Sequence, residues 1–141
     1  MRWICLLPVL AACGDEPEDS AVSPCADEDR ASTLALGDSF SGDEVSLVIS
    51  AADPLPAYAG ENLWTIDLSD GAGALEGCGL SAVIAMPDHG HGGPAPAFSE
   101  LGAGSYEAAV EFTMGGYWEL DVSVSCGDIE DVVPVAVCVE S

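Results

Sequence analysis

The chain has 141 residues, of which 25 are acidic and two are lysine or arginine, and its formal net charge is -23 at pH 7. Such an anion repels nucleic-acid phosphates and anionic lipid surfaces, so we expect neither as a binding partner. Hydrophobic residues make up 49% of the sequence and occur in blocks, which excludes a wholly disordered chain and indicates one ordinary domain.

The N-terminus predicts a lipoprotein signal peptide over residues 1–12. Arg2 supplies a positive charge, and the apolar run 3–10 is too short to cross a bilayer. Residues 10–13 are LAAC and match the bacterial lipobox, in which small residues precede a cysteine that is lipidated after cleavage. We therefore expect lipidation at Cys13. A secretory signal that is cut elsewhere is the alternative.

The segment 13–42 is predicted to be a lipidated acidic tether. Its acidic, small and turn-forming residues cannot bury enough apolar surface to fold alone, and they would give the domain reach from the membrane. Gly14 follows the predicted lipidated cysteine. By the enterobacterial sorting rule, this residue favours the outer membrane over the inner. The expected location is therefore the cell envelope, lipid-anchored and facing the periplasm.

From about residue 43 onwards, apolar and polar residues alternate with the period of a β-strand. No helical period runs longer than a turn or two. The pattern predicts an all-β fold, an immunoglobulin-like antiparallel β-sandwich of about seven strands over residues 43–141. The expected strands, separated by turn residues, are 45–50, 64–69, 80–86, 97–101, 106–114, 117–124 and 132–140.

Four cysteines remain beyond the predicted signal and lipidation site, and an even number in an oxidising compartment predicts two disulfides. In an immunoglobulin-like order the third and sixth strands are antiparallel neighbours. Cys78 and Cys126 are in phase with the core residues of these strands, so we expect them to be bonded. A Cys25–Cys138 disulfide follows by exclusion and would join the tether to the last strand. None of the four has a CxxC spacing, so a thiolate metal site is not expected.

The Cys78–Cys126 pairing also sets the register of the third and sixth strands. It places Met86 opposite Trp118 and Gly90 opposite Met114. The loop that holds both histidines is therefore expected at the same end of the sandwich as Met114.

The segment 86–93, MPDHGHGG, indicates a metal site. Thioether sulfur and neutral imidazole are copper ligands, for Cu(I) above all, and the glycines relax the backbone of the loop. Asp88 would orient an imidazole or add an oxygen ligand, and Trp118 would exclude water. The candidate copper ligands are two methionines and two histidines: Met86, His89, His91 and Met114.

Each candidate ligand also has an ordinary structural explanation. Met86 and Met114 are in phase with core residues, and histidine is tolerated in a glycine-rich loop. The second hypothesis is therefore a metal-free structural or protein-interaction module that is tethered to the membrane and docks a partner through an edge strand or loop. The copper hypothesis requires the histidines and Met114 to lie close together, whereas the interaction hypothesis allows them to point apart.

Enzyme motifs are missing from the sequence, and we expect no catalytic activity. There is no GxSxG or HExxH element, and beyond the signal the only lysine or arginine is Arg30, so the usual cations of oxyanion and phosphate chemistry are lacking. The weaker alternatives are a glycosidase carboxylate pair, Glu107 and Glu111, and a calcium site made of Asp67, Asp70 and Asp121.

Three elements together resemble the YtkA-like domain family and the related FixH-like proteins: GxNxWxIxLxD at 60–70, MPxHGHG at 86–92 and FxMxGxW at 112–118. The resemblance covers roughly residues 43–126. It implies an immunoglobulin-like fold and a copper-linked binding role for the same two methionines and two histidines. It also implies a copper transport or oxidase assembly protein as partner. The chain departs from the family in its four extracytoplasmic cysteines, its lipoprotein form and its lack of the membrane helix of FixH-like proteins.

Overall fold

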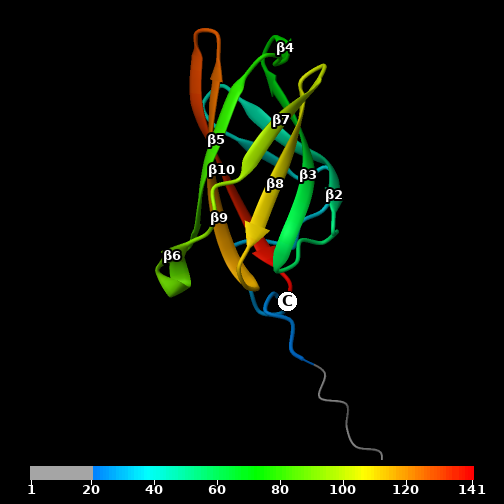
Figure 1. Ribbon diagram of the computed structural model, residues 1–141, viewed down its shortest axis with the longest axis vertical. Helices are drawn as coiled ribbons and strands as arrows, with labels where there is room; N and C mark the ends of the chain where they lie inside the picture. Colours follow the sequence, from blue (N-terminus) through cyan, green and yellow to red (C-terminus); the bar gives the residue numbers. More distant parts are fainter. Residues whose placement is uncertain (1–20) are drawn as a thin grey trace, which may run out of the picture.

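The computed structural model describes residues 21–141, in which two antiparallel β-sheets pack face to face as a sandwich (Figure 1). The predicted signal, Cys13 and the first part of the expected tether lie outside the described residues. Within the described range, no helix is long and apolar enough to span a bilayer. One 3-10 turn, η1 (Pro87–His89), follows β5. The strands are β1 (Ser39–Ser41), β2 (Ser46–Asp53), β3 (Gly60–Asp70), β4 (Gly73–Ala74), β5 (Gly79–Met86), β6 (His91–Gly92), β7 (Ala97–Gly102), β8 (Ser105–Phe112), β9 (Gly116–Cys126) and β10 (Ile129–Val139).

The order of the strands confirms the predicted immunoglobulin-like sandwich. One sheet runs β1-β2-β3-β8-β7, with β4 paired to β3, and the other runs β10-β9-β5-β6. The orders β2-β3-β8-β7 and β10-β9-β5 are those of the two sheets of an immunoglobulin constant domain. These seven strands correspond to the seven segments expected from the alternation, whereas β1, β4 and β6 are additions of two or three residues.

The core lies between the sheets because the alternating residues of each long strand turn their apolar side chains inwards. In β9, buried and exposed residues alternate from Trp118 to Cys126. The tyrosine in the core also bonds to the backbone: the Tyr106 hydroxyl donates to the Leu75 carbonyl at 2.9 Å and accepts from the Cys78 amide at 3.1 Å. The largest fully buried side chains include Trp118, Tyr106, Phe112, Leu47, Ile49, Ile66, Leu68 and Leu120.

Both expected disulfides are present, Cys78–Cys126 with a Cα–Cα distance of 4.4 Å and Cys25–Cys138 with 5.7 Å. The register of β5 on β9 also agrees with the prediction, since Leu80 lies opposite Val124 and the ladder continues to Ala85 opposite Glu119. Two disulfides in one small domain indicate an oxidising, extracytoplasmic location.

The folded part begins before residue 43, in a segment that was expected to be tether. Leu34 is only 3% exposed, Thr33 bridges to Cys138, and β1 pairs with β2. Cys138 is out of phase with the inward-facing valines of β10, and yet it is fully buried because this N-terminal segment covers the outer face of the sheet. A disulfide, one buried leucine and short stretches of backbone pairing hold the segment on the domain, and none of these produces a long alternation of apolar and polar residues.

Candidate metal-binding site

The histidine loop, residues 86–93, forms a tight turn at one end of the sandwich and projects beside β9 (Figure 1). After η1, Gly90 adopts a left-handed conformation with φ of 65°, and its amide donates back to the Met86 carbonyl at 3.1 Å. The chain then returns as β6, antiparallel to β5, with His91 directly opposite Met86. Gly92 cannot be replaced without movement, because a Cβ there would lie 2.8 Å from the Ile84 carbonyl oxygen. The conformation of the turn therefore explains why glycine occupies positions 90 and 92.

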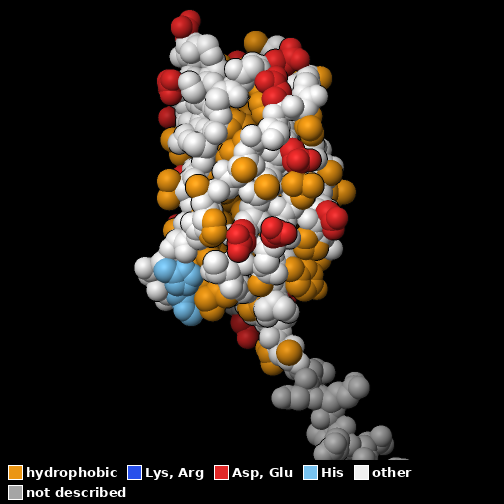
Figure 2. Space-filling model, in the orientation of Figure 1, with side chains coloured by type: hydrophobic (Ala, Val, Ile, Leu, Met, Phe, Trp, Pro, Cys, Tyr) orange, Lys and Arg blue, Asp and Glu red, His pale blue; other side chains and the backbone are white. Residues whose placement is uncertain are grey.

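The two imidazoles lie next to each other and against a tryptophan. The ring centroids of His89 and His91 are 5.9 Å apart, and His91 meets the ring of Trp118 edge-on at 5.7 Å. Figure 2 shows both histidines together on the surface, beside apolar side chains. The Nδ1 atom of His91 lies 3.1 Å from the Gly92 carbonyl, to which it donates. The neutral tautomer that does so leaves Nε2 with a free lone pair, the form in which histidine binds metals.

Met86 is paired with His91 across the β5–β6 ladder. Directly opposite residues of an antiparallel ladder point to the same face with Cβ atoms about 5 Å apart, which brings the Met86 side chain close to that of His91. Met86 is only 2% exposed. A Cβ on Gly116 would lie 2.6 Å from its terminal methyl carbon, so this methyl group packs against the backbone of Gly116.

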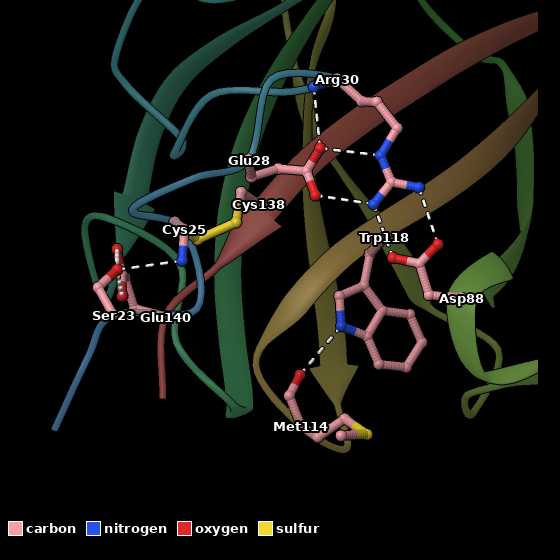
Figure 3. The surroundings of a disulfide bond; sticks show 9 residues. All are labelled: Ser23, Cys25, Glu28, Arg30, Asp88, Met114, Trp118, Cys138 and Glu140. Atoms are coloured by element: carbon pink, nitrogen blue, oxygen red, sulfur yellow. Dashed lines mark hydrogen bonds and ion pairs between the residues drawn. A yellow bond between two sulfur atoms is a disulfide. The ribbon is translucent and has the colours of Figure 1, made fainter.

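Met114 lies at the same end of the sandwich, in the turn between β8 and β9. The alternation predicts that it continues the inner face of β8, but β8 ends at Phe112 and Met114 is 37% exposed. The indole Nε1 of Trp118 donates to the Met114 carbonyl at 3.0 Å (Figure 3). Trp118 is fully buried, and it connects His91, which lies against its ring, with the backbone of the methionine turn, to which its indole nitrogen donates.

Asp88 is engaged differently from the sequence-based expectation. Its two carboxylate oxygens accept from Nη1 and Nη2 of Arg30 at 2.8 and 2.6 Å, and in the described part of the chain no hydrogen bond joins it to an imidazole. Hydrogen bonding from Arg30 is the main cause that lowers the pKa of Asp88, and the charge of His89 contributes least.

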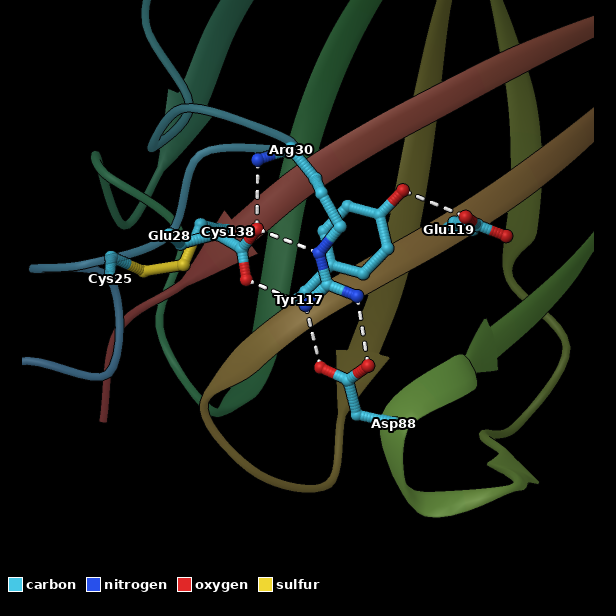
Figure 4. Close-up of polar contacts among 7 residues, drawn as sticks. All are labelled: Cys25, Glu28, Arg30, Asp88, Tyr117, Glu119 and Cys138. Carbon is cyan, nitrogen blue, oxygen red and sulfur yellow. Dashed lines mark hydrogen bonds and ion pairs between the residues drawn. A yellow bond between two sulfur atoms is a disulfide. The ribbon is translucent and has the colours of Figure 1, made fainter.

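Arg30 forms a cluster that no pattern in the sequence predicts (Figure 4). Besides Asp88, the guanidinium donates to both carboxylate oxygens of Glu28 at 2.8 Å and lies over the ring of Tyr117, 4.0 Å from its centroid. These hydrogen bonds lower the pKa of Glu28 to about 2 and raise the pKa of Arg30. The Tyr117 hydroxyl in turn donates to the Glu119 carboxylate, and this hydrogen bond raises the pKa of Tyr117. The one sequence signal was that Arg30 is the sole lysine or arginine after residue 2.

The donor set restricts the metals that fit this end of the molecule. Within residues 21–141, no group of three or more His, Cys, Asp and Glu side chains is arranged to hold a metal ion, and all four cysteines are in disulfides. A metal bound by both histidines would therefore take its remaining protein ligands from methionine sulfur, which favours copper over harder ions. No family model matches the chain, and no curated protein or solved structure matches it either.

Proposed function

We propose that this protein is a non-catalytic copper-binding or copper-handling lipoprotein with a YtkA-like domain. The observation that carries the proposal is the placement of His91, which lies directly across the ladder from Met86 and edge-on against the indole of Trp118. This placement puts an imidazole and a thioether side chain on neighbouring strands at one apolar, partly open end of the sandwich. Such a soft and poorly hydrated donor set suits Cu(I).

Each ligand has a distinct role in this proposal. His89 and His91 are exposed and receive the ion first, and Met114 is partly exposed and joins them from the neighbouring turn. Met86 is buried, so its sulfur forms the inner wall of the site. Trp118 lies on the inner side of the site, where its ring excludes water and its hydrogen bond positions the methionine turn.

Copper titration of the full chain tests this function. Cys5→Ser and Cys13→Ser remove the thiols that would bind Cu(I) by themselves, and ascorbate keeps the copper reduced while the disulfides stay intact. A competing chelator measures the affinity. We expect one tight equivalent in this background and its loss in a further His89→Ala/His91→Ala variant.

A matched control separates a specific site from general attraction of cations to an acidic protein. Asp128→Asn/Glu130→Gln changes two side chains at the β9–β10 turn, at the opposite end of the sandwich. This variant should bind copper as tightly as the background protein. Binding that is equally weak in all three proteins would refute the copper function.

We also propose that Cys13 is lipidated and anchors the protein in the cell envelope, with the outer membrane favoured over the inner. The LAAC sequence and the acidic residues that follow it support this anchoring. Cys13→Ser should release the protein from the membrane fraction into the soluble periplasmic fraction. Retention of the Cys13→Ser protein in the membrane fraction would contradict lipid anchoring.

One observation favours the interaction module as a second candidate function. A groove of about 440 Å³ crosses the outer face of the larger sheet beside Leu63, which is 45% exposed. Leu63→Ser should abolish cross-linking to an envelope partner, whereas Val83→Ser, an exposed valine of the other sheet, should not. Equal cross-linking by both variants would count against the groove. Its floor and rim include Leu63, Pro94, Ala97, Ala109, Asp53, Glu61 and Glu111.

A further inference from the structure

Arg30 is the only lysine or arginine among the described residues. Its guanidinium is hydrogen-bonded to two carboxylates, those of Glu28 and Asp88. Its guanidinium donates two hydrogen bonds to Glu28 in its own segment and two to Asp88 in the histidine loop. Bidentate pairing of this kind fixes orientation as well as distance, because the planar fork of the guanidinium matches the carboxylate.

Asp88 is the residue through which the loop is held. It lies in η1, between Met86 at the end of β5 and His89, so its position sets where the first imidazole lies. No residue of η1 is buried, and the turn is followed by three glycines in the next four residues. Among the described residues, the Arg30–Asp88 pair is the one side-chain hydrogen-bonded connection from η1 to another part of the molecule.

Arg30 is itself firmly placed by the folded domain. It stacks on Tyr117, and its segment is attached to β10 by the Cys25–Cys138 disulfide and by a hydrogen bond from the Cys138 amide to the Ser32 carbonyl at 3.0 Å. Figures 3 and 4 show the disulfide, Arg30 and Asp88 in sequence along this face. A continuous series of contacts therefore extends from the last strand to the histidine loop.

We propose that Arg30 is a positioning residue of the copper site, acting through Asp88 to hold the histidine loop in its binding geometry; the inference rests on the proposed copper function. Residues that orient ligands without touching the metal commonly change metal affinity 10–100-fold when they are substituted. We expect Arg30→Gln to weaken copper binding by about tenfold.

The sign of this effect separates positioning from general electrostatics. Removing the one cation beside the site makes the site more negative and frees the Asp88 carboxylate, so charge alone predicts tighter copper binding. Loss of the attachment predicts weaker binding. Arg30→Gln thus gives opposite results under the two explanations, and Arg30→Lys, which keeps the charge but not the planar fork, should restore only part of the affinity.

The test is a copper titration of the full chain in the Cys5→Ser/Cys13→Ser background, with Arg30→Gln, Asp88→Asn and the variant carrying both. If Arg30 acts through Asp88, the combined variant should bind no more weakly than the weaker single variant. Chemical denaturation of each protein ensures that only folded variants are compared. Asp88→Asn leaves the attachments of the N-terminal segment intact, which keeps the test valid if Arg30→Gln unfolds.

The imidazole NMR resonances of His89 and His91 in the metal-free protein give a second readout. They should shift and broaden in Arg30→Gln if the loop is released, and stay unchanged if Arg30 serves only global stability. Unchanged resonances, or copper binding that is equal or tighter in Arg30→Gln, would overturn the proposal. If the background protein itself fails to bind copper, the proposed function fails, and the metal-free resonances still decide whether Arg30 positions the loop.

Discussion

Removal of the Cys25–Cys138 disulfide should destabilise the protein strongly, because this bond joins the two ends of the folded chain. The cysteines are 113 residues apart, against 48 for Cys78 and Cys126. If the disulfide acts by restricting the unfolded chain, the loop lengths correspond to about 4.8 and about 4.1 kcal/mol at 25 °C. Cys138 is fully buried, so truncating it to alanine adds a small packing loss.

Urea unfolding followed by tryptophan fluorescence measures this loss for Cys25→Ala/Cys138→Ala. For a slope of roughly 1.5–2 kcal/mol per molar urea, a loss of about 4.8 kcal/mol lowers the midpoint by about 2–3 M. The matched comparison is Cys78→Ala/Cys126→Ala, which removes the shorter loop. The long-loop variant should be the less stable of the two by a few tenths of a kcal/mol to about 1 kcal/mol.

A loss below about 1 kcal/mol for Cys25→Ala/Cys138→Ala, with a single cooperative transition, would refute the reasoning. It would mean that the N-terminal segment is already constrained in the unfolded chain or contributes little to the fold. A larger loss for the short-loop variant would show that native packing, rather than loop length, determines the contribution of each disulfide.

Three further predictions concern single side chains. The Asp131 carboxylate accepts hydrogen bonds from the backbone amides of residues 43–45, and these bonds lower the pKa of Asp131. The ionised carboxylate therefore stabilises the fold above the unfolded pKa near 4, and this stabilisation is lost as the pH falls through the lower folded pKa. The free energy of unfolding of Asp131→Asn should therefore lie below that of the native protein at pH 7 and converge with it in acid titrations of stability. Tyr106→Phe should cost about 1–3 kcal/mol in urea unfolding, because it leaves two backbone groups beside β5 without a partner; a neutral result would mean that water replaces the hydroxyl. Gly116→Ala should cost more than 1 kcal/mol in thermal unfolding, because φ is 129° and the new Cβ would strike Met86, whereas Gly71→Ala, where nothing lies within 4 Å, should be tolerated.

The sandwich was predictable because the sequence pattern within each strand shows which residues face the core. Alternation along each strand marks the buried face, and the phase of Cys78 and Cys126 relative to that face was enough to pair β5 with β9 in the observed register. That register in turn placed the histidine loop and Met114 at one end. The prediction that Met114 faces the core was wrong for a local reason too. Two glycines follow Met114 and end the alternation, and its side chain is partly exposed.

The N-terminal segment and the Arg30 cluster could not be read in this way. Tyr117 and Cys138 face each other on the outer face of the smaller sheet, where the alternation predicts exposure, and both are buried. They are buried by a segment nearly a hundred residues away in the chain, whose acidic composition is typical of a linker. An ion pair such as Arg30–Asp88 spans 58 residues and follows no spacing rule, so only the folded chain reveals it.

The attachment of the N-terminal segment bears on how the proposed copper site would meet the membrane, if the proposed lipid is present. Ser23 bonds to Glu140, and Pro24 lies against Gly115, so the chain enters the domain beside the methionine turn. With a lipid on Cys13, the ten residues up to Ser23 span at most about 35 Å. The histidines would then lie at the end of the domain where the chain arrives from the bilayer. If both proposals hold, copper exchange with a membrane-bound partner would be a meeting of two molecules confined to one surface, and its rate would depend on concentration per area rather than per volume.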